Sequence, residues 1–210
     1  MVSRARLTSA RAARGANDPT IAPAIVPLIE AHAARLEQLT GVGWRKDAEA
    51  QARMHRAVQA LYGVDAVTIA AGGWLDRESA PLAADVVRRL RPVLGTRAGI
   101  AIVLPDAPSD ALAEIVQILG AEEPDAFFQR VDADALDPAA ESLAEFYGAT
   151  LLAIGHSPSA GVVALPAAEL VPSTESPRGA LYTTRAEIDA LADPQRVRAA
   201  IAVLRARHGG

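Results

Sequence analysis

Three short runs of the chain are apolar at nearly every position, and each ends in a polar turn that leads into a helical pattern. The runs cover residues 67–71, 100–104 and 151–154. A continuous apolar run is typical of a strand covered on both faces, and alternation with helices is typical of parallel strands joined by crossover helices. We therefore expect these three strands to be parallel and to lie in one sheet, with any ligand site at their carboxyl ends.

Weaker patterns extend this alternation. Further strand candidates cover residues 24–29, 162–165 and 180–182. They bring the total to about six, whereas residues 124–146 are expected to be mostly helical. A closed barrel of eight strand–helix units usually needs ~250 residues, so 210 residues predict either an abridged barrel or an open, doubly wound sheet. We expect a single domain over residues 1–210, with a helical N-terminal segment over about residues 1–22.

Composition excludes several classes of function. The chain has 21 Lys and Arg against 25 Asp and Glu, a net charge of −4 and no cysteine. A negative net charge gives no general attraction to nucleic acid or to an anionic membrane. The lack of cysteine removes disulfides, thiolate nucleophiles and thiolate metal sites. Because no apolar stretch reaches the ~18 residues of a membrane span and no signal peptide is recognisable, we expect a cytoplasmic protein.

Several short motifs, taken in their order along the chain, resemble one known superfamily. They read RLTSA (6–10), PAIVP (23–27), LTG (39–41), YGVDA (62–66), EFYGA (145–149), LYTTRAEI (181–188) and DP (193–194). This order is similar to that of uroporphyrinogen decarboxylase-type proteins, a superfamily that also contains corrinoid-linked methyltransferases. The resemblance implies an α/β fold, a parallel (β/α) barrel of the TIM type that is incomplete because it has about six strands.

The same resemblance implies a small-molecule enzyme that acts on a carboxylated substrate, as a decarboxylase-like lyase or a methyltransferase-like enzyme. A decarboxylase of this kind requires no cofactor, whereas a methyltransferase would use a corrinoid. The chain lacks the Arg-rich first loop of the decarboxylases and the zinc-binding cysteines of the methyltransferases. These departures keep a second hypothesis open, a catalytically degenerate relative that binds a ligand or a partner protein. In either case, open strand edges in a short barrel predict a homodimer or a hetero-partner.

Four ionisable residues that follow strand candidates are candidate catalytic residues. His156 follows the third apolar run and suits general acid–base catalysis near neutral pH, although a bond to a loop carbonyl would explain it equally well. Asp76 follows the second strand, where it either replaces the aspartate of the decarboxylases or lies with Ser79 at the start of a helix. Glu30 and His32 follow the first strand and would face one ligand only in an extended segment, because they diverge on a helix.

Three residues are candidates for substrate binding. Arg77 and Arg185 follow strands and would hold a carboxylate, and Trp74 would stack on a flat ligand or pack in the core. If the chain is an enzyme, we expect His156, Asp76 and Arg185 to converge on one pocket. No His, Asp and Glu cluster has the local spacing of a metal site.

Two further polar features are assigned to structure rather than to chemistry. Residues 184–187 (TRAE) match a capping box. In this motif the Thr184 hydroxyl accepts from the Glu187 N–H, and the Glu187 carboxylate reaches back to the Thr184 N–H. This motif predicts that a helix begins at residue 184. His55 lies in a helical pattern and is expected at the surface.

Overall fold

The computed structural model describes residues 23–160, 162–165 and 181–208, so the helix expected over residues 1–22 lies outside the described residues. The described part of the chain contains seven strands. They are β1 (Ala24–Ile25), β2 (Ala66–Ile69), β3 (Gly99–Val103), β4 (Ala126–Gln129), β5 (Leu151–Ala153), β6 (Val162–Leu165) and β7 (Leu181–Thr184). Six of them coincide with strands predicted from the sequence, and β4 is the exception.

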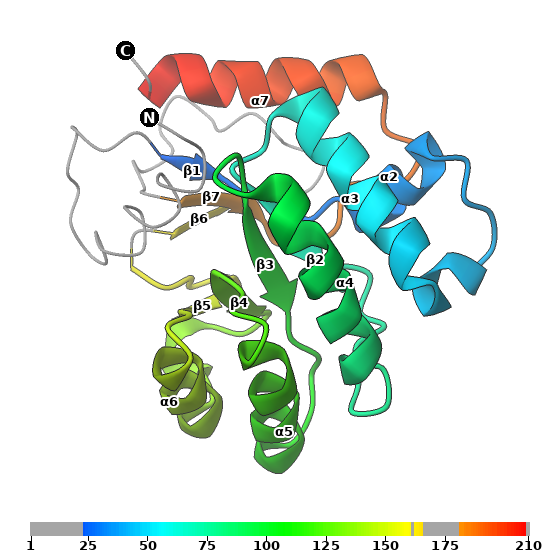
Figure 1. Cartoon of the computed structure of the whole chain (residues 1–210). Coiled ribbons are helices and arrows are strands. Elements are labelled where there is room, and N and C mark those ends of the chain that lie inside the picture. Colours follow the sequence, from blue (N-terminus) through cyan, green and yellow to red (C-terminus); the bar gives the residue numbers. More distant parts are fainter. Residues whose placement is uncertain (1–22, 161, 166–180, 209–210) are drawn as a thin grey trace.

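All of the paired strands run parallel. One sheet has four strands in the order β2-β3-β4-β5, and the other has three in the order β1-β7-β6 (Figure 1). The strands predicted to be parallel in one sheet are β2, β3 and β5, and this prediction is confirmed. The chain is therefore an α/β protein with parallel sheets.

Strand β4 corrects the expectation that residues 124–146 are mostly helical. Only α6 (Pro138–Phe146) in this region is an α-helix, and β4 lies between β3 and β5 in the sheet. Phe127 and Phe128 are fully buried on opposite faces of β4, one in each of the two apolar clusters of the protein. Burial between two flanking strands thus decides the conformation of a segment too short to show a period of its own.

Helices lie around the outside of the two sheets (Figure 1). They are α2 (Glu30–Leu36), α3 (Ala48–Tyr62), α4 (Ala80–Leu94), α5 (Ser109–Gly120), α6 and α7 (Pro194–His208), with the short 3-10 helices η1 (Gly43–Lys46) and η2 (Ala133–Ala135). From α2 to α6, each helix packs against the next one along the chain. This arrangement follows from strand–helix–strand crossovers that all step in the same direction along the sheet.

The two sheets enclose a shared apolar interior. A cluster of buried side chains takes at least one residue from each of the seven strands, separate from the larger cluster between strands and helices. Its members within strands are Ala24, Ala66, Ala101, Val103, Ala126, Phe128, Leu152, Val162 and Leu181. Alternate residues of a strand point to opposite faces, so the inward faces of all seven strands meet around one centre.

Asp65 joins the two sheets where their strand pairing is interrupted. Its backbone N–H donates to the carbonyl of Ile25 at 3.0 Å, and its carboxylate Oδ2 accepts from the Ile25 N–H at 3.0 Å. The side chain therefore bridges β1 to the start of β2 without a regular ladder. Within the described residues, ladder pairing is absent both between β1 and β2 and between β5 and β6.

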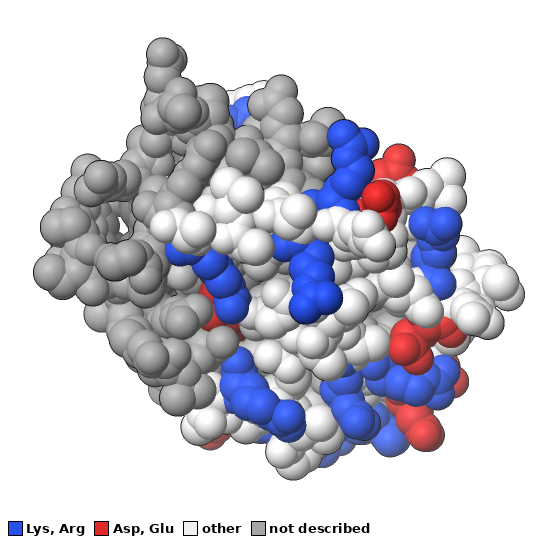
Figure 2. Space-filling view, turned by 90° about the horizontal axis from the view of Figure 1, so that it is seen from above, with Lys and Arg blue, Asp and Glu red and all other residues white. Residues whose placement is uncertain are grey.

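Two further observations concern the surface and the helices. In the view of Figure 2, several basic side chains stand apart among uncharged residues, a pattern unlike the continuous basic stripe of a nucleic-acid-binding face. None of the helices in the described ranges combines the length and apolarity required to cross a membrane.

Candidate functional site

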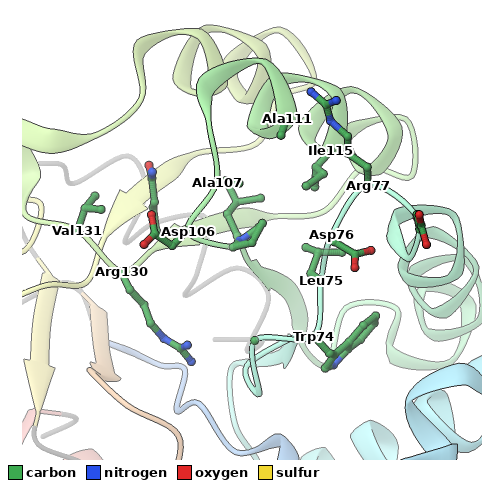
Figure 3. A pocket seen from close by; sticks show the side chains of 15 residues that line it. Trp74, Leu75, Asp76, Arg77, Asp106, Ala107, Ala111, Ile115, Arg130 and Val131 are labelled. Atoms are coloured by element: carbon green, nitrogen blue, oxygen red, sulfur yellow. The ribbon is translucent and has the colours of Figure 1, made fainter.

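A pocket of about 920 Å³ lies at the carboxyl ends of β2, β3 and β4 (Figure 3). Its walls are formed by residues 73–78 after β2, residues 104–107 after β3, residues 129–131 at the end of β4, and two side chains of α5. The carboxyl ends of parallel strands are where ligands bind in folds of this class. The position and size of this pocket make it the candidate ligand site.

The two arginines of the pocket lie in different surroundings. Arg77 pairs with two acidic side chains of α5, Asp110 and Glu114, the latter at 3.0 Å. Figure 3 shows it at the α5 edge of the pocket. Arg130 extends from the end of β4 to the opposite edge and donates to the carbonyl of Ala71. The sequence does not indicate Arg130 as a site residue, because β4, the strand that it follows, is not predicted from the sequence.

Asp76 lies in an exposed turn before α4. Its Oδ1 accepts from the Ser79 N–H at 2.8 Å and from the Ser79 hydroxyl at 2.7 Å, and the Asp76 N–H donates to the Ser79 Oγ at 2.8 Å. The hydrogen bonds from Ser79 lower the pKa of Asp76, which stays ionised at neutral pH. The sequence allows Asp76 either to replace the aspartate of the decarboxylases or to lie with Ser79 at the start of a helix. The structure shows the bonds with Ser79 just before α4, in a turn that also lines the pocket.

Glu30 begins α2 and is completely buried. Its Oε1 accepts from the Ala70 N–H at 3.1 Å and from the Trp74 Nε1–H at 2.9 Å, and its Oε2 accepts from the Gly72 N–H at 2.8 Å. Burial raises the pKa of Glu30 to about 7, against the opposing effect of the bonds from Gly72 and Trp74. A carboxyl group in this range can hold or release a proton at neutral pH.

Three charged side chains from distant parts of the chain meet at Gly72. A Cβ atom at this position would lie 3.2 Å from Arg45 Nη2, 3.2 Å from Glu30 Oε2 and 3.4 Å from Glu187 Oε2. Burial raises the pKa of Glu187, while the positive charges of Arg130 and Arg45 act in the opposite direction. Arg130 donates to the carbonyl of the neighbouring Ala71. The side chains of Glu30, Glu187, Arg45 and Arg130 are therefore called the Gly72 cluster from here on. Within the described residues, no group of three or more His, Cys, Asp or Glu has the arrangement of a metal site.

Glu187 corrects the capping-box prediction. Thr184 belongs to β7 and its Oγ1 accepts from the Leu28 N–H at 3.1 Å, while the Glu187 carboxylate accepts from the Ala31 N–H. No helix begins at residue 184; the next one is α7, which starts at Pro194. The motif therefore ties the end of β7 to the segment after β1. The sequence signal that could identify Glu187 is its position shortly after a strand, three residues beyond the end of β7. The same kind of position identifies Glu30 as a candidate.

His55 corrects a second structural assignment. It is fully buried on α3, with its Nε2 3.9 Å from Glu30 Oε1, which is too far for a hydrogen bond. Burial lowers the pKa of His55 to about 4, so the ring is neutral at pH 7 and forms no ion pair with Glu30. The expectation of a surface histidine is wrong because α3 packs on both α2 and α4, leaving this side chain no exposed face.

The other candidate residues fall into separate places. His32, on the same helix as Glu30, points elsewhere and has its Nε2 2.7 Å from the Tyr62 hydroxyl, and burial lowers its pKa. The segment is helical, so Glu30 and His32 diverge as expected on a helix. His156 and Arg185 contact each other, with 3.2 Å between Nδ1 and Nη1. Neither of them lines the pocket that contains Asp76.

Comparisons with known proteins add little to this geometry. No family model matches the chain, and no curated protein does. Among solved structures, the chain is similar to a rubisco-like protein (MtnW) from Alicyclobacillus acidocaldarius, with 18% sequence identity and a TM-score of 0.43. The match covers 70% of this chain and 35% of that protein, so the chain spans about a third of its length. The function is therefore argued from the site itself.

Proposed function

We propose that the chain is a small-molecule enzyme of the TIM-barrel type that acts on a carboxylated substrate, with the substrate bound at the carboxyl ends of β2, β3 and β4. The sequence resemblance implies a decarboxylase-like lyase or a methyltransferase-like enzyme, and the reaction proposed here is the decarboxylation. The observation that carries the proposal is Arg130, a cation on the wall of the pocket that also belongs to a cluster with two carboxylic acids. Arg130 thus links the pocket wall to Glu187, which lies outside the pocket lining and on which its charge acts.

Arg130 is better suited than Arg77 to hold the substrate carboxylate. The side chain of Arg77 is committed to Asp110 and Glu114. A guanidinium carries five N–H donors in a fixed planar arrangement that matches a carboxylate, and the bond to the Ala71 carbonyl uses one of them in Arg130. Trp74 lines the same pocket and offers a flat apolar surface to the rest of the substrate (Figure 3).

Glu187 is the group proposed to exchange a proton with the substrate. It is half-buried, its pKa is raised by burial, and the positive charge of Arg130 acts on its carboxylate. Loss of CO₂ from a carboxylated carbon leaves an electron pair that must take up a proton, and a protonated carboxylic acid is a suitable donor. Asp76 is less suitable as this donor because the bonds from Ser79 keep it ionised.

The proposal is tested by ligand binding and product analysis with wild-type protein and two matched arginine variants. A panel of aromatic mono- and dicarboxylates, tetrapyrroles, corrinoids and folates is screened by thermal shift, and any hit is assayed for release of CO₂. We expect a carboxylated compound to raise the melting temperature, and Arg130→Ala to weaken its binding by about 10- to 100-fold, the loss of one charged hydrogen-bonded contact. Arg77→Ala, which removes the same charge from the same pocket, should weaken binding much less.

Equal effects of the two arginine variants would contradict the role of Arg130. Binding that depends on Arg130 without any turnover would instead favour the degenerate, ligand-binding relative. Glu187→Gln separates these outcomes, because in an enzyme it should reduce turnover of a bound substrate more than it reduces affinity. The resemblance to the uroporphyrinogen decarboxylase superfamily, the cytoplasmic location and the dimer or hetero-partner expected from open strand edges stay predictions.

A further inference from the structure

The segment that connects β2 to the pocket is hydrogen-bonded by a charged side chain from another part of the chain, Glu30 of α2. Residues 70–74 follow β2 directly, and Trp74 at their end forms part of the pocket wall. Ala70 has a φ of 62°, in the left-handed region that residues with a Cβ adopt at a cost. The Gly73 N–H closes a turn onto the Ala70 carbonyl at 3.0 Å. A backbone in this conformation needs partners that fix it, and Glu30 accepts from three donors of this segment.

We propose that Glu30 is the positioning residue of the pocket: in its ionised form it holds residues 70–74 so that Trp74 forms the pocket wall, and on protonation it releases Trp74. The inference rests on the proposed function only in taking this pocket as the ligand site. Glu30 itself is fully buried and lines no part of the pocket, so its action on a ligand passes through Trp74.

The chemistry of the carboxyl group explains why its ionisation matters. An ionised carboxylate is an acceptor only, and its two oxygens match three N–H donors. A protonated carboxyl group carries an O–H, which cannot accept in the same direction and would face an N–H of the segment. Trp74 is the donor that can leave most easily, because its indole is the end of a side chain, whereas the N–H groups of Ala70 and Gly72 are fixed in the backbone.

The groups that face Glu30 define how it responds to pH. They are His55 on α3, Arg45 of η1, and Glu187 after β7, with Arg130 after β4 acting on Glu187. Burial raises the pKa of Glu30 to about 7, and the negative charge of Glu187 adds to this shift. His55 stays neutral above about pH 4, and the arginines keep their charge throughout. Glu187, whose pKa burial also raises, is therefore the other carboxyl group that needs a control.

Trp74 itself provides the signal for the test. The chain has two tryptophans, so Trp44→Phe leaves Trp74 as the single indole fluorophore. Emission wavelength and acrylamide quenching are followed from pH 5 to pH 9 without any ligand, in this background alone and combined with Glu30→Gln or Glu187→Gln. Glutamine keeps the size of Glu30 but presents an amide NH₂, which cannot accept a hydrogen bond.

We expect a red shift and stronger quenching as the pH falls, with a midpoint near pH 7 and a width of about two pH units, as for a single titrating group. The transition should be absent in Glu30→Gln and retained in Glu187→Gln. A flat profile in the Trp44→Phe protein would overturn the inference even if the Glu30→Gln variant fails to fold. A transition that Glu187→Gln abolishes and Glu30→Gln retains would assign the effect to Glu187. Because no ligand is present, these results are independent of whether the proposed enzyme function holds.

Discussion

Two carboxylates hold the two ends of the segment between β2 and α4, and they do so in opposite environments. Asp76 lies in an exposed turn and is bonded by Ser79, three residues along the chain. Glu30 is fully buried and is bonded by Ala70, Gly72 and Trp74, which lie 40 to 44 residues along the chain. Both accept several N–H or O–H groups, yet the pKa of Asp76 is lowered and that of Glu30 is raised.

In Glu30 the loss of solvation outweighs the hydrogen bonds in setting the pKa, whereas in exposed Asp76 the hydrogen bonds dominate. Water still stabilises ionised Asp76, so the bonds from Ser79 add to that stabilisation. Glu30 has lost its water, and three N–H donors do not fully replace it. At the exposed end of the segment, the bonds between Asp76 and Ser79 stabilise the turn before α4. At the buried end, the protonation of Glu30 would change the position of Trp74 in the pocket wall.

The largest expected effect distinguishes the two carboxylates by stability. Glu30→Ala leaves two backbone N–H groups and an indole N–H without their acceptor, so it should lower the free energy of unfolding at pH 7 by roughly 2–4 kcal/mol. Asp76→Ala removes a solvated turn and should cost about 1 kcal/mol or less. Urea denaturation followed by circular dichroism measures both. Similar losses for the two variants would mean that water reaches Glu30 in solution.

The second test follows stability across pH. Folding raises the pKa of Glu30 from 4.5 to about 7, so the folded state holds this proton more tightly than the unfolded state does. The resulting stabilisation is fully present below pH 4.5 and is lost as the pH rises through 7. The unfolding free energy of wild type minus that of Glu30→Gln should therefore fall by about 3 kcal/mol between pH 4.5 and pH 8, at about 1.4 kcal/mol per pKa unit.

Other titrating groups also change the unfolding free energy of the wild-type protein with pH. They are present in Glu30→Gln as well, so their contributions cancel when the two unfolding free energies are subtracted. The lowered pKa of His55 gives the opposite dependence, a stabilisation present above pH 6.5 and lost as the pH falls toward 4. Glu187 acts in the same direction as Glu30 because its pKa is also raised. A pH-independent difference between the two proteins would show that the Glu30 pKa is close to 4.5 in the folded state.

The parts of this site that depend on neighbouring residues could be predicted from the sequence, and those that depend on distant ones could not. The position after a strand indicates Trp74, Asp76 and Arg77, which line the pocket, and Glu30, which accepts from Trp74. It equally indicates His32, His156 and Arg185, which do not line the pocket. The pairing of Asp76 with Ser79 is one of the two alternatives that the sequence allows. The contact of Glu30 with Gly72 spans 42 residues, and no local spacing indicates it.

Two members of the Gly72 cluster were missed for different physical reasons. Arg130 is hidden because it follows β4, a short buried strand in a region whose sequence pattern predicts a helix. Glu187 was explained by a motif that requires a helix, although residues 185–193 form none. In both cases tertiary pairing with other strands, which a single sequence does not display, overrides the local pattern. The parallel order of β2 and β3 is predictable because a clear helical pattern follows each of them, whereas β5 joins the same sheet although the next element described after it is the strand β6.

The smallest expected effect concerns the exposed end of the segment and tests whether it is a closed local unit. Asp76→Ala and Ser79→Ala each remove two of the three hydrogen bonds of this turn and share the bond between the two side chains, so each should cost about 0.5–1 kcal/mol of unfolding free energy, and the double variant should cost less than the sum of the two. Adding Glu30→Ala to the double variant should give a loss close to the sum of the two, because the two ends are linked by hydrogen bonds through one residue, Trp74, by its indole N–H to Glu30 and by its carbonyl to Ser79. Urea denaturation of the variants provides the cycle. A loss smaller than this sum would indicate that release of Trp74 also loosens the turn at Asp76, through the bond of the Ser79 hydroxyl to the Trp74 carbonyl at 3.2 Å.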